Sequence, residues 1–230
     1  MRAPSVKLMR RVLLGIIILT LASVLVNYLQ TWRHRSRQVS RAPQILDAAM
    51  KLYLKEGYKN VTIRKIAKSI EYSPATIYLY FKDKEEIFFT LQKHGFEKFV
   101  KIQISVQSIK NPVKRLLAHG EAYVKFALEN KEYYDLMFIT SEPVLMLKER
   151  KDWDTGINSY DLLKQNVKSC IEAGFIKTKD VEITSFALWS FVHGISSLLI
   201  KRGFMIPEEF RKHILKGAFE ILNGLISYKR

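Results

Sequence analysis

The sequence predicts an all-α fold, and three observations carry this prediction. Apolar side chains recur every three or four residues from Gln44 onward, which is the spacing of amphipathic helices. The chain has only 10 Gly and 6 Pro, so it offers few of the turns that a sheet of short strands needs. Its 230 residues are enough for one or two domains. We therefore expect a hydrophobic segment over residues 1–43, a helical unit over residues 44–91, and a larger helical domain over residues 92–230.

The first part contains an uncharged run of eighteen residues from Val12 to Leu29. As a helix this run would span about 27 Å, close to the thickness of a bilayer core. Arginines flank it on both sides, and Trp32 follows at the position of a membrane interface. Four Lys or Arg precede the run and four follow it, so the positive-inside rule does not orient it.

Three alternatives explain this segment. It is a transmembrane anchor, or an extension upstream of a working protein that starts at Val39, or a signal peptide. No small-x-small cleavage site follows the run, which disfavours the signal peptide. As an anchor, the fifteen residues from Leu29 to Gln44 would reach at most ~50 Å and would hold the rest of the chain near the membrane.

The next segment, Gln44 to Gly57, predicts the first helix of the second part. Its apolar positions lie on one face, and Gly57 follows as a C-terminal stop. The predicted buried stripe is Ile45, Leu46, Ala49, Leu52 and Tyr53.

A second helix is predicted from Thr62, which is a good N-cap, to about Glu71. Its apolar face is formed by Ile63, Ile66, Ala67 and Ile70.

A third helix is predicted to begin three residues later. Ser73 is its N-cap and Pro74 takes the first helical position, where the missing N–H costs nothing. We expect this helix to continue to Phe81. Asp83 and Glu86 then form a capping box for a long helix that runs to about residue 109. A helix, a tight turn, a second helix and a capped long helix are the elements of a helix-turn-helix unit.

This succession resembles the TetR/AcrR family of bacterial transcriptional regulators. The family has Gly where this chain has Glu71, and a positive φ at a non-glycine residue costs on the order of 1 kcal/mol, so we expect a slightly strained turn. The resemblance covers about residues 42–91 and implies a DNA-binding unit. The matching residues are Thr62, Arg64, Ile66, Ala67, Ser73, Thr76, Tyr78, Tyr80, Phe81, Lys84, Glu85 and Glu86.

The predicted DNA contacts fall into two groups. Small and hydroxylated side chains at the start of the third helix can approach base edges, whereas cationic and hydroxyl groups around it can bind phosphates. The predicted base-edge residues are Ser73, Pro74, Ala75 and Thr76. The predicted phosphate contacts are Thr62, Arg64, Tyr78 and Lys84, with Lys82 as a weaker candidate.

The net charge of +16 is weaker evidence for DNA binding than these residues are. Residues 1–43 hold eight Lys or Arg and no acidic residue, which is half of the excess. Between Gln44 and Gln92, eight basic residues oppose six acidic ones and leave only +2. The placement of residues in the motif therefore carries the functional prediction.

The third part predicts a helical domain for ligand binding and dimerisation. Pro112 opens a helix that runs to Asn130, a short aromatic helix covers residues 131–138, and residues 141–156 form a loop. Three further helices are predicted over residues 157–173, 182–202 and 208–228, of which the first two are stopped by glycines. The run from Trp189 to Gly194 resembles the Trp-x-x-x-His-Gly signature of one TetR C-terminal subfamily.

Several large side chains of this domain can either line a pocket for an apolar ligand or form an ordinary helical core. The candidates are Tyr123, Phe126, Tyr133, Tyr134, Met137, Phe138, Phe186, Trp189 and His193. His193 lies in an apolar helix, where a structural hydrogen-bonded role competes with a ligand contact. No Cys or His partner lies at metal-ligand spacing, so we predict no metal site. The lone Cys170 cannot form a disulfide within the chain.

Together these features predict a regulator that binds double-stranded operator DNA as a homodimer and responds to an apolar or aromatic small molecule. The resemblance implies that the last two helices of each subunit pair into a four-helix bundle. We expect a cytoplasmic protein, tethered to the inner membrane if residues 12–29 are an anchor. A membrane-anchored sensor or scaffold that does not bind DNA is the alternative. An enzyme is disfavoured, because the sequence has no carboxylate pair, nucleophile with its base or phosphate-binding glycine loop, and no cofactor is expected.

Overall fold

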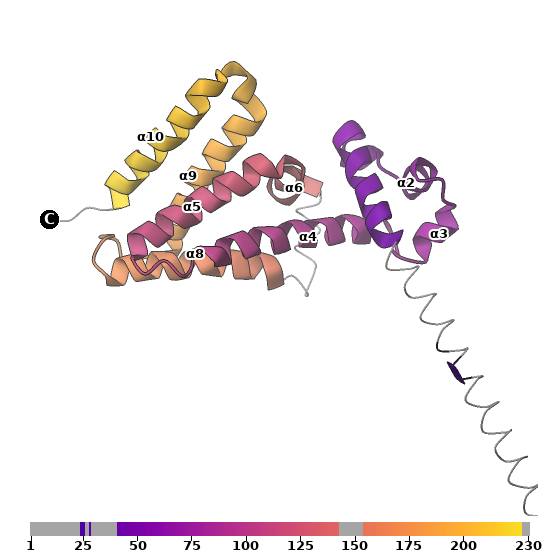
Figure 1. The fold of residues 1–230 in the computed structure, drawn as a ribbon, viewed down its shortest axis with the longest axis horizontal. Coiled ribbons are helices and arrows are strands. Elements are labelled where there is room, and N and C mark those ends of the chain that lie inside the picture. Colours follow the sequence, from indigo (N-terminus) through magenta and orange to yellow (C-terminus); the bar gives the residue numbers. More distant parts are fainter. Residues whose placement is uncertain (1–23, 26–27, 29–40, 143–153, 227–230) are drawn as a thin grey trace, which may run out of the picture.

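The computed structural model describes residues 24, 25, 28, 41–142 and 154–226, and every element within them is helical, as the sequence predicts (Figure 1). The first helix covers residues 41–56. The later elements are η1 (Tyr58–Asn60), α2 (Ile63–Ser69), α3 (Pro74–Tyr78), α4 (Lys84–Ser105), α5 (Pro112–Glu129), α6 (Lys131–Tyr134), the π-helical turn η2 (Asp135–Ile139), α8 (Asp154–Glu172), α9 (Val181–Arg202), η3 (Gly203–Met205) and α10 (Glu208–Ile226).

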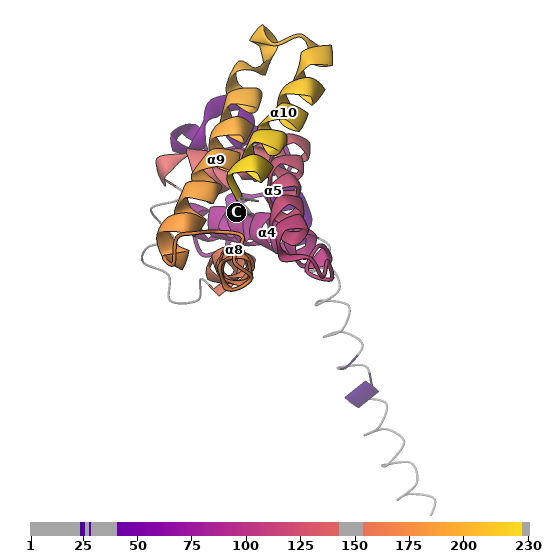
Figure 2. The same ribbon diagram turned by 90° about the vertical axis from the view of Figure 1, so that its left-hand side faces the viewer.

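These elements form two bodies joined by one long helix. The first helix, α2 and α3 make a compact group that we call the N-terminal unit, and α4 leads from it into the C-terminal body (Figure 1). In that body α4 packs against α8 and α5, and α5 also packs against α8, α9 and α10. Both views place the end of the α9–α10 hairpin on the side of α5 that faces away from α4 and α8 (Figure 2).

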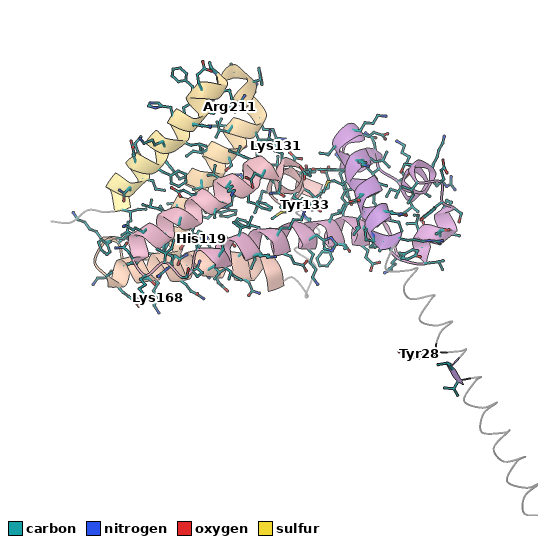
Figure 3. The ribbon with its side chains drawn as sticks, in the orientation of Figure 1. Tyr28, His119, Lys131, Tyr133, Lys168 and Arg211 are labelled. Atoms are coloured by element: carbon teal, nitrogen blue, oxygen red, sulfur yellow. The ribbon has the colours of Figure 1, made fainter. Side chains whose placement is uncertain are left out.

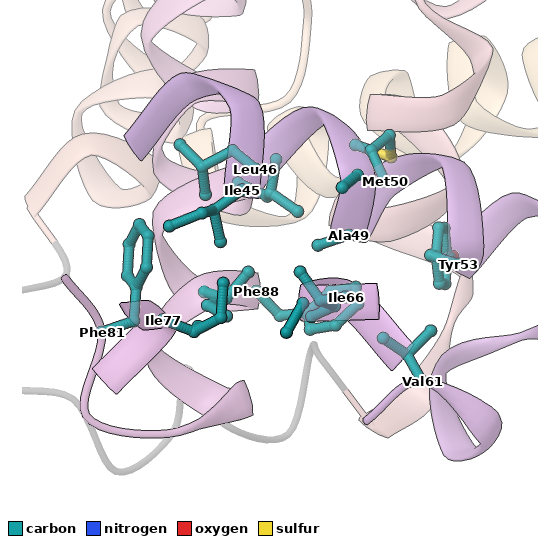
Figure 4. Packing of buried hydrophobic residues seen from close by; sticks show 14 of the residues in the cluster. Ile45, Leu46, Ala49, Met50, Tyr53, Val61, Ile66, Ile77, Phe81 and Phe88 are labelled. Atoms are coloured by element: carbon teal, nitrogen blue, oxygen red, sulfur yellow. The ribbon is translucent and has the colours of Figure 1, made fainter. Parts of the chain in front are cut away.

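The N-terminal unit is built around one apolar core (Figure 4). The first helix, α2, α3 and the start of α4 all contribute to it, and its most buried side chains include Ile45, Ile66, Ile77 and Phe88. Of the stripe predicted for the first helix, only Leu52 is half-buried rather than buried. Because these side chains come from every helix of the unit, the same core fixes the angle between α2 and α3.

Three predicted N-caps are present. The Thr62 side chain accepts a hydrogen bond from the backbone N–H of Lys65, and the Ser73 side chain accepts one from Thr76. The Asp83 side chain accepts one from Glu86 at 2.7 Å. Each bond satisfies an N–H group that has no partner inside its helix. The Glu86 carboxylate accepts from the backbone N–H of Lys82, one residue before the cap, so the capping box closes one position early.

The turn between α2 and α3 is strained where the sequence predicts it. Glu71 has φ of 58° and is the one non-glycine with positive φ in the described part of the chain. The N–H of Tyr72 bonds to the carbonyl of Ala67 at 2.8 Å, and the N–H of Glu71 bonds to that of Lys68 at 3.3 Å. This pair of bonds is the Schellman arrangement, which normally places glycine at the position of Glu71.

Two elements differ from the prediction. The third helix was expected to reach Phe81, but α3 ends at Tyr78, because the N–H groups of Leu79 and Tyr80 bond three residues back and tighten the last turn. The aromatic helix was expected to continue to Phe138, but it changes after Tyr134 into the π-helical turn η2. The other described helices begin and end within a few residues of their predicted limits.

The candidate membrane segment lies almost wholly outside the described residues. Within the run 12–29, residues 24, 25 and 28 are helical and exposed (Tyr28 is labelled in Figure 3). The alternative start at Val39 and most of the predicted 141–156 loop also lie outside.

One described helix is long and apolar enough to cross a membrane, and it covers Val181–Met205. It packs against α5 and α8 as part of the C-terminal body. Only 22% of its most apolar stretch is buried within the chain, so this helix still presents a large apolar face.

Candidate DNA-binding surface and ligand cavity

The first candidate site is the exposed face of α3. Ile77 is fully buried and anchors the helix to the core of the N-terminal unit, so the residues on its other side face outward. Ser73, Pro74 and Ala75 are exposed, while Thr76 is half-buried. The four residues predicted to approach base edges therefore lie together at the N-terminal end of one short helix.

The hydroxyl groups of this face are held in defined positions. The Ser73 Oγ accepts the backbone N–H of Thr76 at 3.2 Å and lies 2.9 Å from the Thr76 Oγ1. Two hydroxyls that share one hydrogen bond use only one of their two protons, so the other proton can be donated outward. This end of α3 can therefore donate as well as accept.

The predicted phosphate contacts are not equivalent. Thr62, Arg64, Tyr78 and Lys82 are exposed around α3, and the Tyr78 side chain is 57% exposed. Lys84, in contrast, donates to the Tyr58 carbonyl at 3.2 Å and lies 4.0 Å from the centre of the Tyr58 ring. Lys84 would have to leave these contacts to reach a phosphate.

Two features of this surface were not predicted. Leu79 is 69% exposed beside Tyr78, where an apolar side chain can contact a thymine methyl group. The Tyr72 hydroxyl donates to Gln44 at 2.8 Å, and the Arg41 guanidinium lies 5.4 Å from the centre of the Tyr72 ring. These contacts brace the start of the first helix against the turn before α3. They join residues about thirty apart, which local sequence patterns do not reveal.

The second candidate site is a cavity of about 690 Å³ inside the C-terminal body. Its wall comes mainly from α4, α5, α8 and α9, with further residues from η2 and α10. The size is within the range of sites for small molecules, and most of the wall is apolar or aromatic.

Six of the nine predicted pocket residues lie in this wall: Tyr123, Met137, Phe138, Phe186, Trp189 and His193. Three do not. Phe126 is buried in the core between α4 and α5, Tyr134 is fully buried behind His193, and Tyr133 packs between the N-terminal unit and the C-terminal body (Figure 3). The pattern at helical spacing correctly marked apolar faces, but it does not separate the residues that border a cavity from those one layer behind it.

The sequence prediction missed the polar residues at one end of the cavity, Gln103, His119 and Ser159. His119, labelled in Figure 3, is buried. Its Nε2 lies 3.1 Å from the Gln103 side chain, and its Nδ1 lies 3.2 Å from the Asn166 side chain. Burial lowers its pKa from 6.5 to about 4, so the ring is neutral near pH 7. Its place three residues after the apolar Leu116, on the helix predicted from Pro112 to Asn130, was the available signal.

A second polar group surrounds His193. The hydroxyls of Tyr123 and Tyr134 each lie 3.0 Å from its Nδ1. The Tyr134 hydroxyl also donates to the His193 carbonyl at 3.1 Å, and the Trp189 indole donates to the Tyr123 hydroxyl at 3.3 Å. Burial lowers the pKa of His193 below its ordinary value, so this ring is also neutral near pH 7.

The cavity is linked to the N-terminal unit by residues 131–139, which we call the aromatic segment. Met137 and Phe138 form part of the cavity wall, whereas the adjacent Leu136 is buried in the core of the N-terminal unit. α4 passes close to this segment: a Cβ at Gly95 would lie 2.5 Å from the Met137 sulfur, so only glycine allows this approach without a shift.

Asp135 strengthens the link between the bodies. Its carboxylate accepts hydrogen bonds from the Tyr53 hydroxyl at 2.6 Å and the Thr140 hydroxyl at 2.9 Å, and it forms an ion pair with Lys201 of α9. Burial alone would raise the pKa of Asp135, but the hydrogen bonds from Lys201, Tyr53 and Thr140 outweigh it and hold the pKa below its usual value. Asp135 thus joins the first helix to α9.

Comparison with known proteins gives a consistent result for both parts of the chain. Residues 45–91 match the bacterial regulatory proteins of the tetR family, and residues 116–216 match the tetracyclin repressor-like C-terminal domain. YhgD, an uncharacterised HTH-type transcriptional regulator of Bacillus subtilis (strain 168), is 31% identical over 161 residues, which are 65% of this chain and 79% of YhgD.

Solved structures share the fold. The fatty acid degradation regulator FadR from Bacillus halodurans aligns with a TM-score of 0.66 at 19% identity, over 82% of this chain and 97% of FadR. AibR, in its complex with isovaleryl coenzyme A and operator DNA, aligns with a TM-score of 0.56 at 23% identity, over 68% of this chain and 86% of AibR.

Proposed function

The chain belongs to the TetR family of helix-turn-helix transcriptional regulators, and we propose that it is a repressor that binds a near-palindromic operator as a homodimer and is released by a small molecule. The observation that carries this proposal is the aromatic segment. It forms part of the cavity wall through Met137 and Phe138 and part of the core of the N-terminal unit through Leu136. A molecule that enters the cavity therefore meets residues that are packed directly against the DNA-binding unit.

The α9–α10 hairpin supports the homodimer. Its exposed apolar residues are Ile183, Phe186, Leu198, Phe204, Met205, Phe210, Ile214 and Ile221. Exposed apolar side chains gathered on one hairpin mostly mark an interface. Gly217 lies on α10, and a Cβ there would meet no described atom within 4 Å, which leaves room for a second helix. Two copies of the hairpin would form a four-helix bundle.

In a two-fold symmetric dimer, the distance between the two α3 helices determines the spacing of the half-sites that they can bind. The two α3 helices would enter successive major grooves about 34 Å apart, so the operator repeats its half-site one helical turn away. Ser73, Pro74, Ala75 and Thr76 would read base edges, and Thr62, Arg64, Tyr78 and Lys82 would position the unit on phosphates. Lys84 would contribute only after it leaves Tyr58.

Ligand binding would act on the separation of the two α3 helices. α4 leads from the N-terminal unit into the C-terminal body and borders the cavity through Phe96, Phe99 and Gln103. A ligand that displaces α4 and the aromatic segment together would turn each N-terminal unit relative to its hairpin. Coupling between two such sites is typically worth 1–3 kcal/mol. AibR, which shares this fold, has been solved with both a ligand and operator DNA.

We place the DNA-binding unit in the cytoplasm, because its operator is there. If residues 12–29 cross the inner membrane, the amino terminus lies outside and the dimer can read only DNA close to the membrane. The unit would then lie within ~50 Å of the bilayer, given the length of chain between Leu29 and Gln44.

A hydroxyl-radical footprint of the full chain on the DNA upstream of its own gene tests this proposal. We expect two protected patches on each strand, related by two-fold symmetry and one helical turn apart. A chain that co-sediments with membranes and protects no part of this DNA would favour the anchored scaffold instead. A single protected patch would contradict the dimeric repressor.

A further inference from the structure

Two histidines border the cavity, and they differ in what they can offer a ligand. His119 of α5 has an amide partner at each ring nitrogen, Gln103 at 3.1 Å and Asn166 at 3.2 Å. Arg115 donates to the Asn166 amide oxygen at 2.8 Å and fixes that partner. Both nitrogens of His119 are therefore already used inside the protein.

His193 of α9 has partners at one ring nitrogen only. Both tyrosine hydroxyls approach Nδ1, at 3.0 Å each. In the described part of the chain, Nε2 has no hydrogen-bond partner, and the side chain borders the cavity. Because Nε2 lies on the opposite side of the ring from the two hydroxyls, it is the nitrogen that a ligand can reach.

The hydrogen bonds around His193 fit a neutral ring that carries its proton on Nε2. The Trp189 N–H donates to the Tyr123 hydroxyl, and the Tyr134 hydroxyl donates to the His193 carbonyl. The Tyr123 hydroxyl can then donate its proton to Nδ1, which lies 3.0 Å away. A neutral imidazole that accepts at Nδ1 carries its proton at Nε2. With this tautomer, His193 is a hydrogen-bond donor toward the cavity.

The charges of the wall restrict the ligand further. None of the described residues that form the wall is Lys or Arg. The one acidic side chain among them, Glu182, is exposed and lies 3.8 Å from Lys164, so it belongs to the rim. A carboxylate buried in this cavity would lose its hydration and find no Lys or Arg among these described wall residues to replace it.

We propose that the cavity takes an uncharged, mainly apolar molecule that carries one carbonyl-type acceptor, and that the Nε2–H of His193 donates to this acceptor. The inference deepens the proposed function, because it assumes that this cavity is the effector site. It names His193, rather than His119, as the residue that recognises the polar atom of the ligand.

Displacement of the neutral apolar dye Nile red from the full chain tests this ligand class. The competitors are 2-undecanone, which is a neutral acceptor, undecanoate, which has the same chain length and a negative charge, and naphthalene, which has no polar group. We expect 2-undecanone to bind at least tenfold more tightly than undecanoate. Equal or tighter binding of undecanoate would overturn the proposal while leaving the effector cavity in place.

Variants of His193 test the donor. His193→Phe removes the N–H and should weaken 2-undecanone about tenfold, the effect of one net hydrogen bond, without weakening naphthalene. His193→Gln keeps an N–H donor and should restore most of the lost affinity. The matched control is His94→Phe, because His94 is exposed on α4 outside the cavity. Unchanged 2-undecanone affinity in His193→Phe would refute the role of His193.

The tautomer of His193 can be measured directly in the parent protein. This measurement needs no ligand and does not require the His193 variants to fold. Long-range nitrogen–proton NMR correlations of the full chain distinguish a protonated Nε2 from a protonated Nδ1. We expect the proton on Nε2, and in Tyr123→Phe, where Nδ1 loses a donor, this preference should weaken. A proton on Nδ1 would overturn the proposal.

If neither the dye nor any competitor binds, the effector cavity itself is wrong, and the proposed function loses its ligand site together with this inference.

Discussion

At the scale of single residues, Glu71 shows the cost of a departure from the usual helix-turn-helix turn. It adopts φ of 58°, where a side chain costs about 1–2 kcal/mol, while glycine loses about 0.5–1 kcal/mol more conformational entropy on folding. Glu71→Gly should therefore raise the free energy of unfolding by about 0.5–1 kcal/mol in urea denaturation. Gly57→Ala is the reverse control, since φ is 76° there and should make alanine destabilising. A less stable Glu71→Gly would show that its side chain stabilises the turn.

Substitutions at two residues of α3 should affect DNA binding in different ways, one through overall affinity and the other through the preference for particular bases. Tyr78→Ala removes an exposed phosphate contact and should weaken binding to operator and to unrelated DNA by similar factors. Thr76→Ala removes a hydroxyl held at the base-reading end of α3 and should relax the preference at one base pair, by about 1–3 kcal/mol. Competition binding against a set of single-base operator variants measures both effects. Parental affinity in Tyr78→Ala would show that Tyr78 does not touch the backbone.

The buried His119 should make the free energy of unfolding depend on pH. The unfolded ring has a pKa near 6.5 and the folded ring one of about 4, so between these values the unfolded state binds more protons than the folded state. Stability is then fully present above pH 6.5 and is lost as the pH falls toward 4, by up to about 3 kcal/mol. In His119→Gln this share of the pH dependence should disappear. Urea denaturation of both proteins between pH 7 and 5 measures the slopes, and equal slopes would contradict a neutral, buried His119.

At the scale of elements, the sequence predicts the helices well because their ends are marked locally. Thr62, Ser73 and Asp83 cap α2, α3 and α4 through bonds to backbone groups three residues away. Gly174 ends α8 through a bond of its N–H to the carbonyl of Ile171 at 3.0 Å. Such signals span one turn of the chain, so a sequence without any structural information contains them.

The link between the two bodies could not be predicted, because it depends on distant residues. Tyr53 and Asp135 are 82 positions apart, and neither has an unusual local sequence. Within η2, Met137 and Phe138 border the cavity, whereas Leu136 lies in the core of the N-terminal unit. The helix predicted over residues 131–138 does not reveal which of its sides meets which body. The site therefore follows from packing between helices rather than from the periodicity within one.

The contribution of Asp135 to this link can be tested by substitution. Asp135→Asn weakens the bonds to Tyr53 and Thr140 and leaves Lys201 without its partner, so the free energy of unfolding should fall by about 1–3 kcal/mol. The matched control is Lys59→Ala, which breaks an exposed ion pair with Glu142 and should cost less than about 1 kcal/mol. Chemical denaturation followed by circular dichroism measures both. Equal effects would mean that Asp135 does not join the two bodies.

At the scale of the whole molecule, the exposed apolar side chains of α9 and α10 form the surface that we propose for the dimer. Leu198 is 62% exposed on α9, and Leu198→Glu would place a charge inside the proposed four-helix bundle. We expect this variant to sediment as a monomer of 26.8 kDa, whereas the parent sediments at twice that mass. Ile104→Glu is the control, because Ile104 is equally apolar and 56% exposed but lies on α4. A dimeric Leu198→Glu would move the interface elsewhere.

We propose above all that the protein binds a specific operator, rather than attracting any DNA through its positive charge. A salt titration of DNA binding tests it most directly, with the promoter upstream of its own gene and a scrambled duplex of the same length. We expect the protein to prefer the promoter by about a thousandfold at physiological salt, as sequence-specific DNA-binding proteins typically do. Equal affinities for both duplexes, falling steeply together as salt rises, would reveal only phosphate attraction and would contradict it.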